Sequence, residues 1–268
     1  MIIIGELING TRKRVKQAIA ERDADYIAKL ARTQAERGAS FIDVNPGTVG
    51  DKEIEDAVWL VKIAQAATDK PLCFDTPNPA AMAAALEAYE GSATPMINSI
   101  SLEKERLDSM LPIIKAAGCN VVALSLGDAG MPTRAGDREK AALPLMDLLM
   151  DQAGLPAERI FMDPIITPVS TQAEVVGLIC GAISAIKEHN PKAHVTSGLS
   201  NISFGLPNRK LLNRVAVTLF MQAGMDSAVL DPLDEKIMGQ IFATEALLCR
   251  DEYCMNYLMA FRAGRLEV

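Results

Sequence analysis

The sequence is poor in the residues that several common classes of site require. Its 268 residues include two histidines, His189 and His194, and neither belongs to an HxH or HExxH motif. The five cysteines are scattered and form no CxxC pair (Cys73, Cys119, Cys180, Cys249 and Cys254). Zinc sites need closely spaced His or Cys ligands, and a GxSxG motif for a nucleophilic serine is missing as well. We therefore expect neither a zinc enzyme nor a Ser–His–Asp hydrolase, and no bound metal ion.

Charge and hydropathy argue against two further classes of protein. The chain has 27 Lys and Arg residues against 34 Asp and Glu residues, and its densest basic segment is TRKRVK at 11–16. Nucleic-acid binding needs a concentrated positive face, so nucleic acid is not expected as a partner. No apolar run approaches the ~18 residues of a membrane span, and the chain starts with the strand-like MIIIGE. With its unpaired cysteines, the sequence predicts a soluble cytoplasmic protein that has no signal peptide.

Short apolar or β-branched runs recur along the chain, and each ends in polar residues. The runs that we expect to be strands are 2–6, 40–45, 71–75, 95–99, 121–125, 160–164, 194–201 and 227–231. Helix-like segments rich in Ala, Leu and charged residues lie between them, at 51–67, 80–89, 102–117, 137–153, 172–188 and 208–223. Strands that alternate with helices indicate a parallel sheet.

Eight such units in 268 residues match the (β/α)₈ TIM barrel, which takes about 250 residues. A glycine stands shortly before four of the expected strands, where a left-handed residue ends the preceding helix (Gly38, Gly118, Gly154 and Gly224). We therefore expect residues 1–268 to form a single barrel domain. A doubly wound open sheet is the alternative, but its GxGxxG phosphate fingerprint follows none of the runs.

In a TIM barrel the carboxyl ends of the strands meet at one face, where the chemistry takes place. The expected strands end here in carboxylates, amides and a hydroxyl: Glu6, Asn9, Asp43, Asn45, Asp75, Asn98, Ser125, Asp163, Asn201 and Asp231. Such groups suit a neutral, planar, nitrogen-rich heterocycle better than a phosphorylated sugar. For Asp43 and Asp231, a turn or helix-capping role is an equally good interpretation. Asp75 and Asp163 could alternatively hold Mg²⁺.

Six motifs in succession resemble those of the pterin-binding methyltransferases. They are GELING (5–10), FIDVNPG (41–47), LCFDT (72–76), MINS (96–99), MDPIITP (162–168) and GLSNISFGLPNR (198–209). The similarity is greatest to the methyltetrahydrofolate:corrinoid/iron–sulfur protein methyltransferases and extends over essentially the whole chain. It implies a pterin-binding TIM barrel that moves a methyl group between N5 of tetrahydrofolate and the cobalt of a corrinoid.

The resemblance also implies roles for individual residues at matching positions. Three of them would hydrogen-bond the pterin ring, namely Asp75, Asn98 and Asp163. Asn201 matches a mobile asparagine that bonds near N5, and Arg209 matches an arginine close to the pocket. The remaining candidates for folate binding are Glu6, Asn9, Asp43 and Ser125. Catalysis would depend on Asn201, with Asp163 and Asp75.

Partners follow from the same resemblance. The chain has no DxHxxG corrinoid-binding motif, so cobalamin would arrive on a partner corrinoid protein or free, and family members are usually homodimers. Relatives carry polar residues where this chain has Phe204. This difference favours methyl transfer in the direction of tetrahydrofolate, as in methylamine or betaine demethylation. The 127–138 loop is either a flexible surface loop or a cover over the pterin.

Two other functions remain as alternatives. Dihydropteroate synthase shares the barrel and the pterin pocket, but its first loop resembles NVTPDSFSDGG, whereas this chain reads NGTRKRV at 9–15. A non-catalytic folate-binding protein is the second alternative, and only an assay of turnover separates it from an enzyme.

Overall fold

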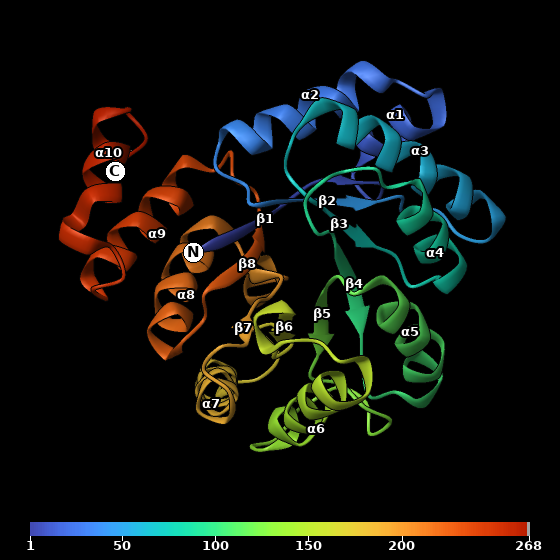
Figure 1. The fold of residues 1–268 in the computed structure, drawn as a ribbon. Helices are drawn as coiled ribbons and strands as arrows, with labels where there is room; N and C mark the ends of the chain where they lie inside the picture. Colours follow the sequence, from blue (N-terminus) through green and yellow to red (C-terminus); the bar gives the residue numbers. More distant parts are fainter. Residues whose placement is uncertain (267–268) are drawn as a thin grey trace.

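Eight parallel strands form the centre of the computed structural model, which describes residues 1–266 (Figure 1). The strands are β1 (Ile2–Asn9), β2 (Phe41–Asn45), β3 (Leu72–Asp75), β4 (Met96–Ile100), β5 (Asn120–Leu124), β6 (Ile160–Asp163), β7 (His194–Val195) and β8 (Ser227–Leu230). They pair in the order β7-β6-β5-β4-β3-β2-β1-β8. Between the two outer strands, the amide of Val229 donates to the carbonyl of Ser197 at 2.9 Å. This contact nearly closes the sheet, and the expected TIM barrel is confirmed.

Helices cover the outside of the barrel. They are α1 (Lys13–Glu21), α2 (Ala24–Glu36), α3 (Asp51–Ala67), α4 (Pro79–Ala88), α5 (Lys104–Ala117), α6 (Asp137–Ala153), α7 (Val175–His189), α8 (Arg209–Ala223), α9 (Glu235–Leu247) and α10 (Met255–Arg262). Helices α2 to α9 each follow one strand, whereas α10 forms a lobe with α9 at the left of Figure 1. None of the described helices combines the length and apolar character needed to cross a membrane.

The seventh strand is shorter than the sequence analysis predicted for 194–201. Pairing with β6 stops at Val195, and Leu199–Ser203 winds into a short 3-10 helix, η2. Gly198 and the short polar side chains of Ser200 and Asn201 favour such a turn, because serine and asparagine compete for the backbone hydrogen bonds of a strand. As a result, the segment that carries Asn201 is a turn above the barrel instead of a strand inside it.

The barrel interior has an apolar floor with a polar layer above it. The floor is a core cluster separate from the larger one outside the barrel, and its buried members are Ile4, Cys73, Met96, Val122 and Phe161. Successive side chains of a strand point to opposite faces, so the residue two positions further along each strand faces inward too. Four of these residues are polar: Glu6, Asp75, Asn98 and Asp163. The alternation thus sets the polar layer at the carboxyl ends of the strands.

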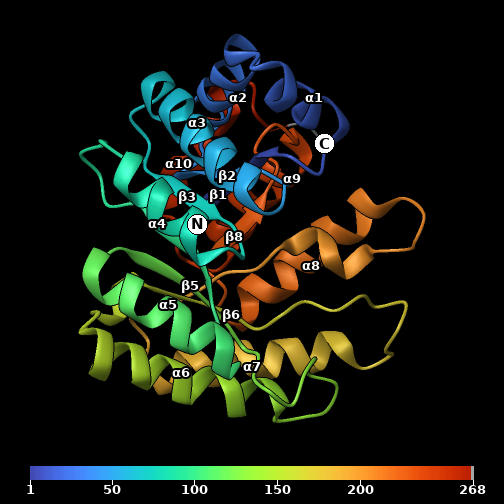
Figure 2. The same cartoon turned by 90° about the vertical axis from the view of Figure 1, so that its right-hand side faces the viewer.

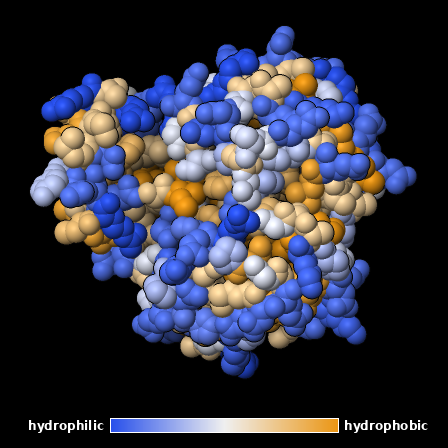
Figure 3. All heavy atoms as spheres, in the orientation of Figure 1, coloured by the Kyte–Doolittle hydropathy of each residue, from blue (hydrophilic) through white to orange (hydrophobic). Residues whose placement is uncertain are grey.

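The loops that follow the strands all lie at the same end of the molecule. Figure 2 shows them at its right, where the loops before α7 and α8 reach furthest out. Figure 3 shows the opposite side of the molecule, which is mostly hydrophilic and has hydrophobic atoms in a hollow beside the lobe of α9 and α10. The polar layer and the loops around it therefore form the candidate site.

Candidate active site

Asp75 and Asn98 lie side by side in the polar layer. They are register partners on β3 and β4, and the Asn45 amide donates to Asp75 Oδ2 at 2.7 Å. Burial raises the pKa of Asp75, while the hydrogen bond from Asn45 and the nearby charge of Arg106 lower it. The pair thus offers a carboxylate beside an amide, which together can accept and donate hydrogen bonds along the edge of a heterocycle.

Asp163 ends β6 and faces the same space. Its Oδ1 accepts the backbone N–H of Ile165 at 2.7 Å, and its carbonyl accepts the N–H of Ser125 at 2.8 Å. Burial raises the pKa of Asp163 to about 7, against the lowering effects of the Ile165 hydrogen bond and the charge of Arg138. Near neutral pH this carboxyl group is therefore populated in both its protonated and its ionised form.

Asp43 is not a turn or cap residue. Its side chain is 2% exposed and lies inside the barrel against Cys73 and Asn98. Burial raises its pKa well above the usual range, and the charges of Asp75 and Glu6 raise it further. Burial and the neighbouring carboxylates thus both favour the neutral acid form of Asp43.

Two buried polar atoms in the candidate site lack a hydrogen-bond partner among the described residues. They are Oδ1 of Asp43 and Oγ of Ser125. Buried polar groups are nearly always paired in native proteins, so atoms of this kind fit a site for a polar ligand. For the alternative of a Mg²⁺ site, no group of three His, Cys, Asp or Glu side chains in the described part of the chain could hold a metal ion.

Two other carboxylates and one amide near the opening already have partners. Glu6 Oε1 accepts Arg12 Nη2 at 2.9 Å, while burial raises the pKa of Glu6. Asp231 Oδ1 accepts the N–H of Leu233 at 2.9 Å, so Asp231 forms a turn. Asn9 Oδ1 accepts the N–H of Thr11 at 2.9 Å, which shapes the first loop. Asp231 and Asn9 therefore organise their own loops.

Asn201 lies exposed in η2 at the opening of the barrel. Its amide nitrogen is 3.4 Å from the place that a Cβ on Gly198 would take, so the glycine leaves room for it. Arg209 fastens this turn, because its Nε donates to Ser203 Oγ at 3.1 Å and its Nη2 to the Ser200 carbonyl at 2.6 Å. Arg209 thus positions the turn that carries Asn201.

Two arginines that the sequence analysis missed brace the loops below the opening. Arg106 of α5 donates from Nε to the Ser99 carbonyl at 2.9 Å and from Nη1 to the Pro77 carbonyl at 2.5 Å. Arg138 of α6 is 1% exposed, and its Nε donates to the Pro164 carbonyl at 2.7 Å. In the sequence both stand in charged helical segments that read as solvent-facing, so no pattern could have marked them.

The 127–138 loop is tied down at several points. Asp137 Oδ2 accepts the N–H groups of Thr133 at 3.2 Å and Arg134 at 2.8 Å, and Gln172 Nε2 donates to the Thr133 carbonyl at 2.6 Å. Together with Ser125, the loop lines a cavity of about 380 Å³. These bonds argue against the flexible-loop interpretation and join the loop to the one after β6.

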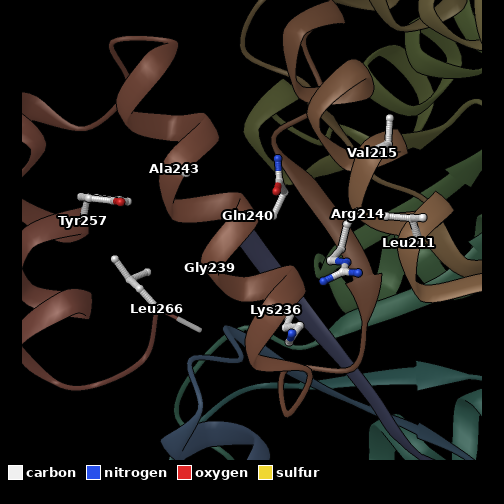
Figure 4. A pocket seen from close by; sticks show the side chains of 9 residues that line it. All are labelled: Leu211, Arg214, Val215, Lys236, Gly239, Gln240, Ala243, Tyr257 and Leu266. Atoms are coloured by element: carbon white, nitrogen blue, oxygen red, sulfur yellow. The ribbon is translucent and has the colours of Figure 1, made fainter. Parts of the chain in front are cut away.

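A second hollow lies outside the barrel, on its helical surface. It is a groove of about 400 Å³ between α8, α9 and α10 (Figure 4). Its lining residues are Leu211, Arg214, Val215, Lys236, Gly239, Gln240, Ala243, Tyr257 and Leu266. None of them belongs to the polar layer, so the groove is not part of the candidate active site.

Comparison with solved structures shows the same fold in dihydropteroate synthases. The enzyme from Stenotrophomonas maltophilia superposes with a TM-score of 0.65 at 15% identity, covering 94% of this chain and 93% of the other. The Yersinia pestis DHPS gives 0.64 at 15% identity, with 93% of each chain covered. At this identity the likeness concerns the fold alone.

Comparison of sequences finds much closer relatives. The methylcorrinoid:tetrahydrofolate methyltransferase of Eubacterium limosum is 40% identical over 271 residues, which cover 99% of this chain and 98% of the relative. Methionine synthase of Mycobacterium tuberculosis is 27% identical over 241 residues, covering 85% of this chain and 20% of that protein. The model of the pterin binding enzyme family matches residues 5–231, from β1 to the end of β8. The chain therefore belongs to the pterin binding enzymes.

Proposed function

We propose that this chain is a methyltransferase that moves a methyl group from a methylated corrinoid to N5 of tetrahydrofolate. The observation that carries the proposal is the 40% identity, over nearly the full length of both chains, to a relative named methylcorrinoid:tetrahydrofolate methyltransferase. The donor and acceptor in that name agree with the direction expected from Phe204. The polar layer supplies a site of suitable chemistry at the carboxyl end of the barrel.

The pterin ring would lie on the polar layer. Asp75 and Asp163 would accept hydrogen bonds from ring N–H and amino groups, and the Asn98 amide would pair with a neighbouring ring atom. The buried, unpartnered Asp43 Oδ1 and Ser125 Oγ support a polar ring at this place. Arg106 and Arg138 would act indirectly, since they fix the loops that follow β3, β4 and β6.

The chemistry requires a change of charge at N5. The N5 lone pair attacks the methyl carbon, the cobalt–carbon bond breaks with its electron pair left on cobalt, and N5 then loses its proton to solvent. Asn201 is the residue that we assign to this atom: its carbonyl oxygen would accept the hydrogen bond of the positively charged N5–H. Such a bond speeds the reaction only if it is stronger in the transition state than in the bound substrate.

Of the alternatives, a dihydropteroate synthase is supported only by structures at about 15% identity, and the first loop departs from its motif. A folate-binding protein without activity would use the same polar layer, so turnover has to be measured.

An anaerobic absorbance assay tests the proposed function. The protein is mixed with tetrahydrofolate and either methylcob(III)alamin or a corrinoid protein from Eubacterium limosum charged with it. We expect protein-dependent loss of the methylcob(III)alamin spectrum and formation of methyltetrahydrofolate. Tight tetrahydrofolate binding without transfer from either donor would identify a folate-binding protein instead, and absence of pterin binding would contradict the site assignment.

We also propose that the chain works as a homodimer in the cytoplasm, with residues 1–268 as a single domain. Leu211, Val215 and Leu219 are exposed at four-residue spacing on α8, and Leu211 and Val215 line the groove in Figure 4. All five cysteines are free, which suits a reducing compartment. Sedimentation equilibrium should give twice the chain mass of 28.8 kDa, and a monomer mass at micromolar concentration would contradict the dimer.

A further inference from the structure

Three large apolar side chains are exposed on loops that follow strands. Val49 after β2 is 85% exposed, Met131 after β5 is 57% exposed, and Phe204 after β7 is 64% exposed. Because these loops all follow strands, their tips stand at the same end of the barrel as Asp75 and Asp163. Strands β2, β5 and β7, which precede these loops, lie at different points around the barrel. The three side chains, here called the mouth residues, thus surround the opening of the site.

The loops that present the mouth residues are fastened to the body of the protein. In the first, Asn45 Oδ1 accepts the N–H of Gly47 at 2.8 Å, and Thr48 donates to Asp56 at 3.0 Å. In the third, Ser170 donates to the Phe204 carbonyl at 3.1 Å, and the Arg209 guanidinium lies 5.8 Å from the centre of the Phe204 ring.

The second loop, which carries Met131, is held by Asp137 and Gln172. In all three loops an apolar side chain is therefore exposed to solvent on a backbone that hydrogen bonds keep in place. Such an arrangement is typical of a surface that binds a partner, because ordered loops lose little conformational entropy on binding.

The position of the mouth residues limits what can cover them. A second copy of this chain seated there would close the opening to folate and to the methyl donor alike. The groove in Figure 4 and the exposed Leu211, Val215 and Leu219 of α8 offer a place for a second copy away from the mouth residues. The molecule that binds over the mouth residues must therefore bind transiently, and it must carry the methyl group that is transferred.

We propose that Val49, Met131 and Phe204 dock the corrin-bearing face of a corrinoid protein. This inference rests on the proposed function, in which cobalt must come within bonding distance of a methyl group at N5. The corrin ring then has to lie over the opening, with the surrounding protein surface against the loop tips. Apolar contacts from three loops with the protein surface around the corrin would then centre the ring over the opening. Phe204 supplies the largest of the three apolar side chains to this contact.

The test is a triple variant, Val49→Ser with Met131→Ser and Phe204→Ser. Its matched control is Leu247→Ser with Phe261→Ser, which removes apolar side chains that are 84% and 68% exposed on α9 and α10. Two donors are compared, the charged corrinoid protein from Eubacterium limosum and free methylcob(III)alamin. Tetrahydrofolate affinity is measured separately by calorimetry.

For the triple variant we expect at least a tenfold loss of kcat/KM with the corrinoid protein and less than a threefold loss with free methylcob(III)alamin. Tetrahydrofolate affinity and the control variant should stay within twofold of wild type. An equal loss with both donors, an equal loss in the control, or no loss would overturn the docking role. Failure of the wild-type protein to transfer a methyl group from either donor would instead contradict the proposed function itself.

Discussion

Asp163→Ala is expected to weaken tetrahydrofolate binding by about two orders of magnitude or more. In the proposed complex the Asp163 carboxylate accepts two N–H groups of the pterin, and leaving both unpaired in a buried site costs ~1–3 kcal/mol each. Asp163→Asn should also bind poorly, because an amide nitrogen would face a ring donor. Titration calorimetry measures the loss. Unchanged affinity in the alanine variant would show that the pterin does not lie on β6.

The pH dependence of binding gives this prediction a second signature. Because the pKa of Asp163 is about 7, the acceptor is increasingly protonated below neutral pH, and wild-type affinity should fall there by up to tenfold per pH unit. The remaining affinity of Asp163→Asn should not follow this trend. Asp231→Asn, which changes a strand-end carboxylate used in a turn, is the matched control and should keep wild-type affinity and its pH profile.

In the absence of ligand, the ionised Asp163 carboxylate should lower the stability of the folded protein at high pH. Its folded-state pKa of about 7 lies above the ordinary aspartate pKa of 3.8, so the folded protein holds this proton more tightly than the unfolded chain. Stability is therefore lost as pH rises from about 4 through 7, at up to ~1.4 kcal/mol per pKa unit. Asp163→Asn should melt at a higher temperature than wild type at pH 8 and at a similar one at pH 4.

Asn201→Ala is expected to slow methyl transfer by about 10² to 10³, as loss of one preorganised partner of a developing charge does, while tetrahydrofolate affinity changes less than fivefold. Asn201 is exposed in η2, and its side-chain amide makes no hydrogen bond among residues 1–266, so its contact with N5 can form as the charge develops. Single-turnover measurements with methylcob(III)alamin separate the transfer step from binding.

Ser200→Ala is the matched control for this variant, since Ser200 stands on the same turn and contributes its carbonyl to the clamp by Arg209. It should transfer the methyl group at nearly the wild-type rate. Equal losses of binding and of the transfer rate in Asn201→Ala would remove the claim that Asn201 acts on the transition state.

The parts of the site that follow from strand periodicity could be predicted. Asp75, Asn98 and Asp163 each stand two residues beyond a residue of the apolar floor, and alternation along a strand fixes the face they share. The limits of α3 and α6, at 51–67 and 137–153, agree with the structure to the residue. Gly118 and Gly154 end helices with φ of 57° and 67°, as their positions predicted. In each case the cause lies within a few residues of the effect.

Contacts between distant segments could not be predicted. Arg106 and Arg138 stand in helical segments where arginine is expected at the surface, yet their guanidinium groups hold loops 29 and 26 residues away in sequence. Likewise, the sequence does not show that the pairing of β7 with β6 stops at Val195 or that Val229 of β8 bonds to Ser197. Nor does the sequence say that Asp43 is buried beside two other carboxylates and not used in a turn.

The sequence by itself therefore determined the eight βα units, the end of the barrel that carries the site, and the carboxylates and amides that line it. Tertiary structure alone decided how these groups behave. Burial raises the pKa values of Asp43, Asp75 and Asp163, and neighbouring carboxylates raise that of Asp43 further, whereas nearby arginines lower those of Asp75 and Asp163. Arginines from the next helices fix the loops, and the loops after β2, β5 and β7 bring Val49, Met131 and Phe204 to one end of the barrel. The physical reason is that alternation and capping act between near neighbours, whereas desolvation and charge depend on what the closed barrel brings together.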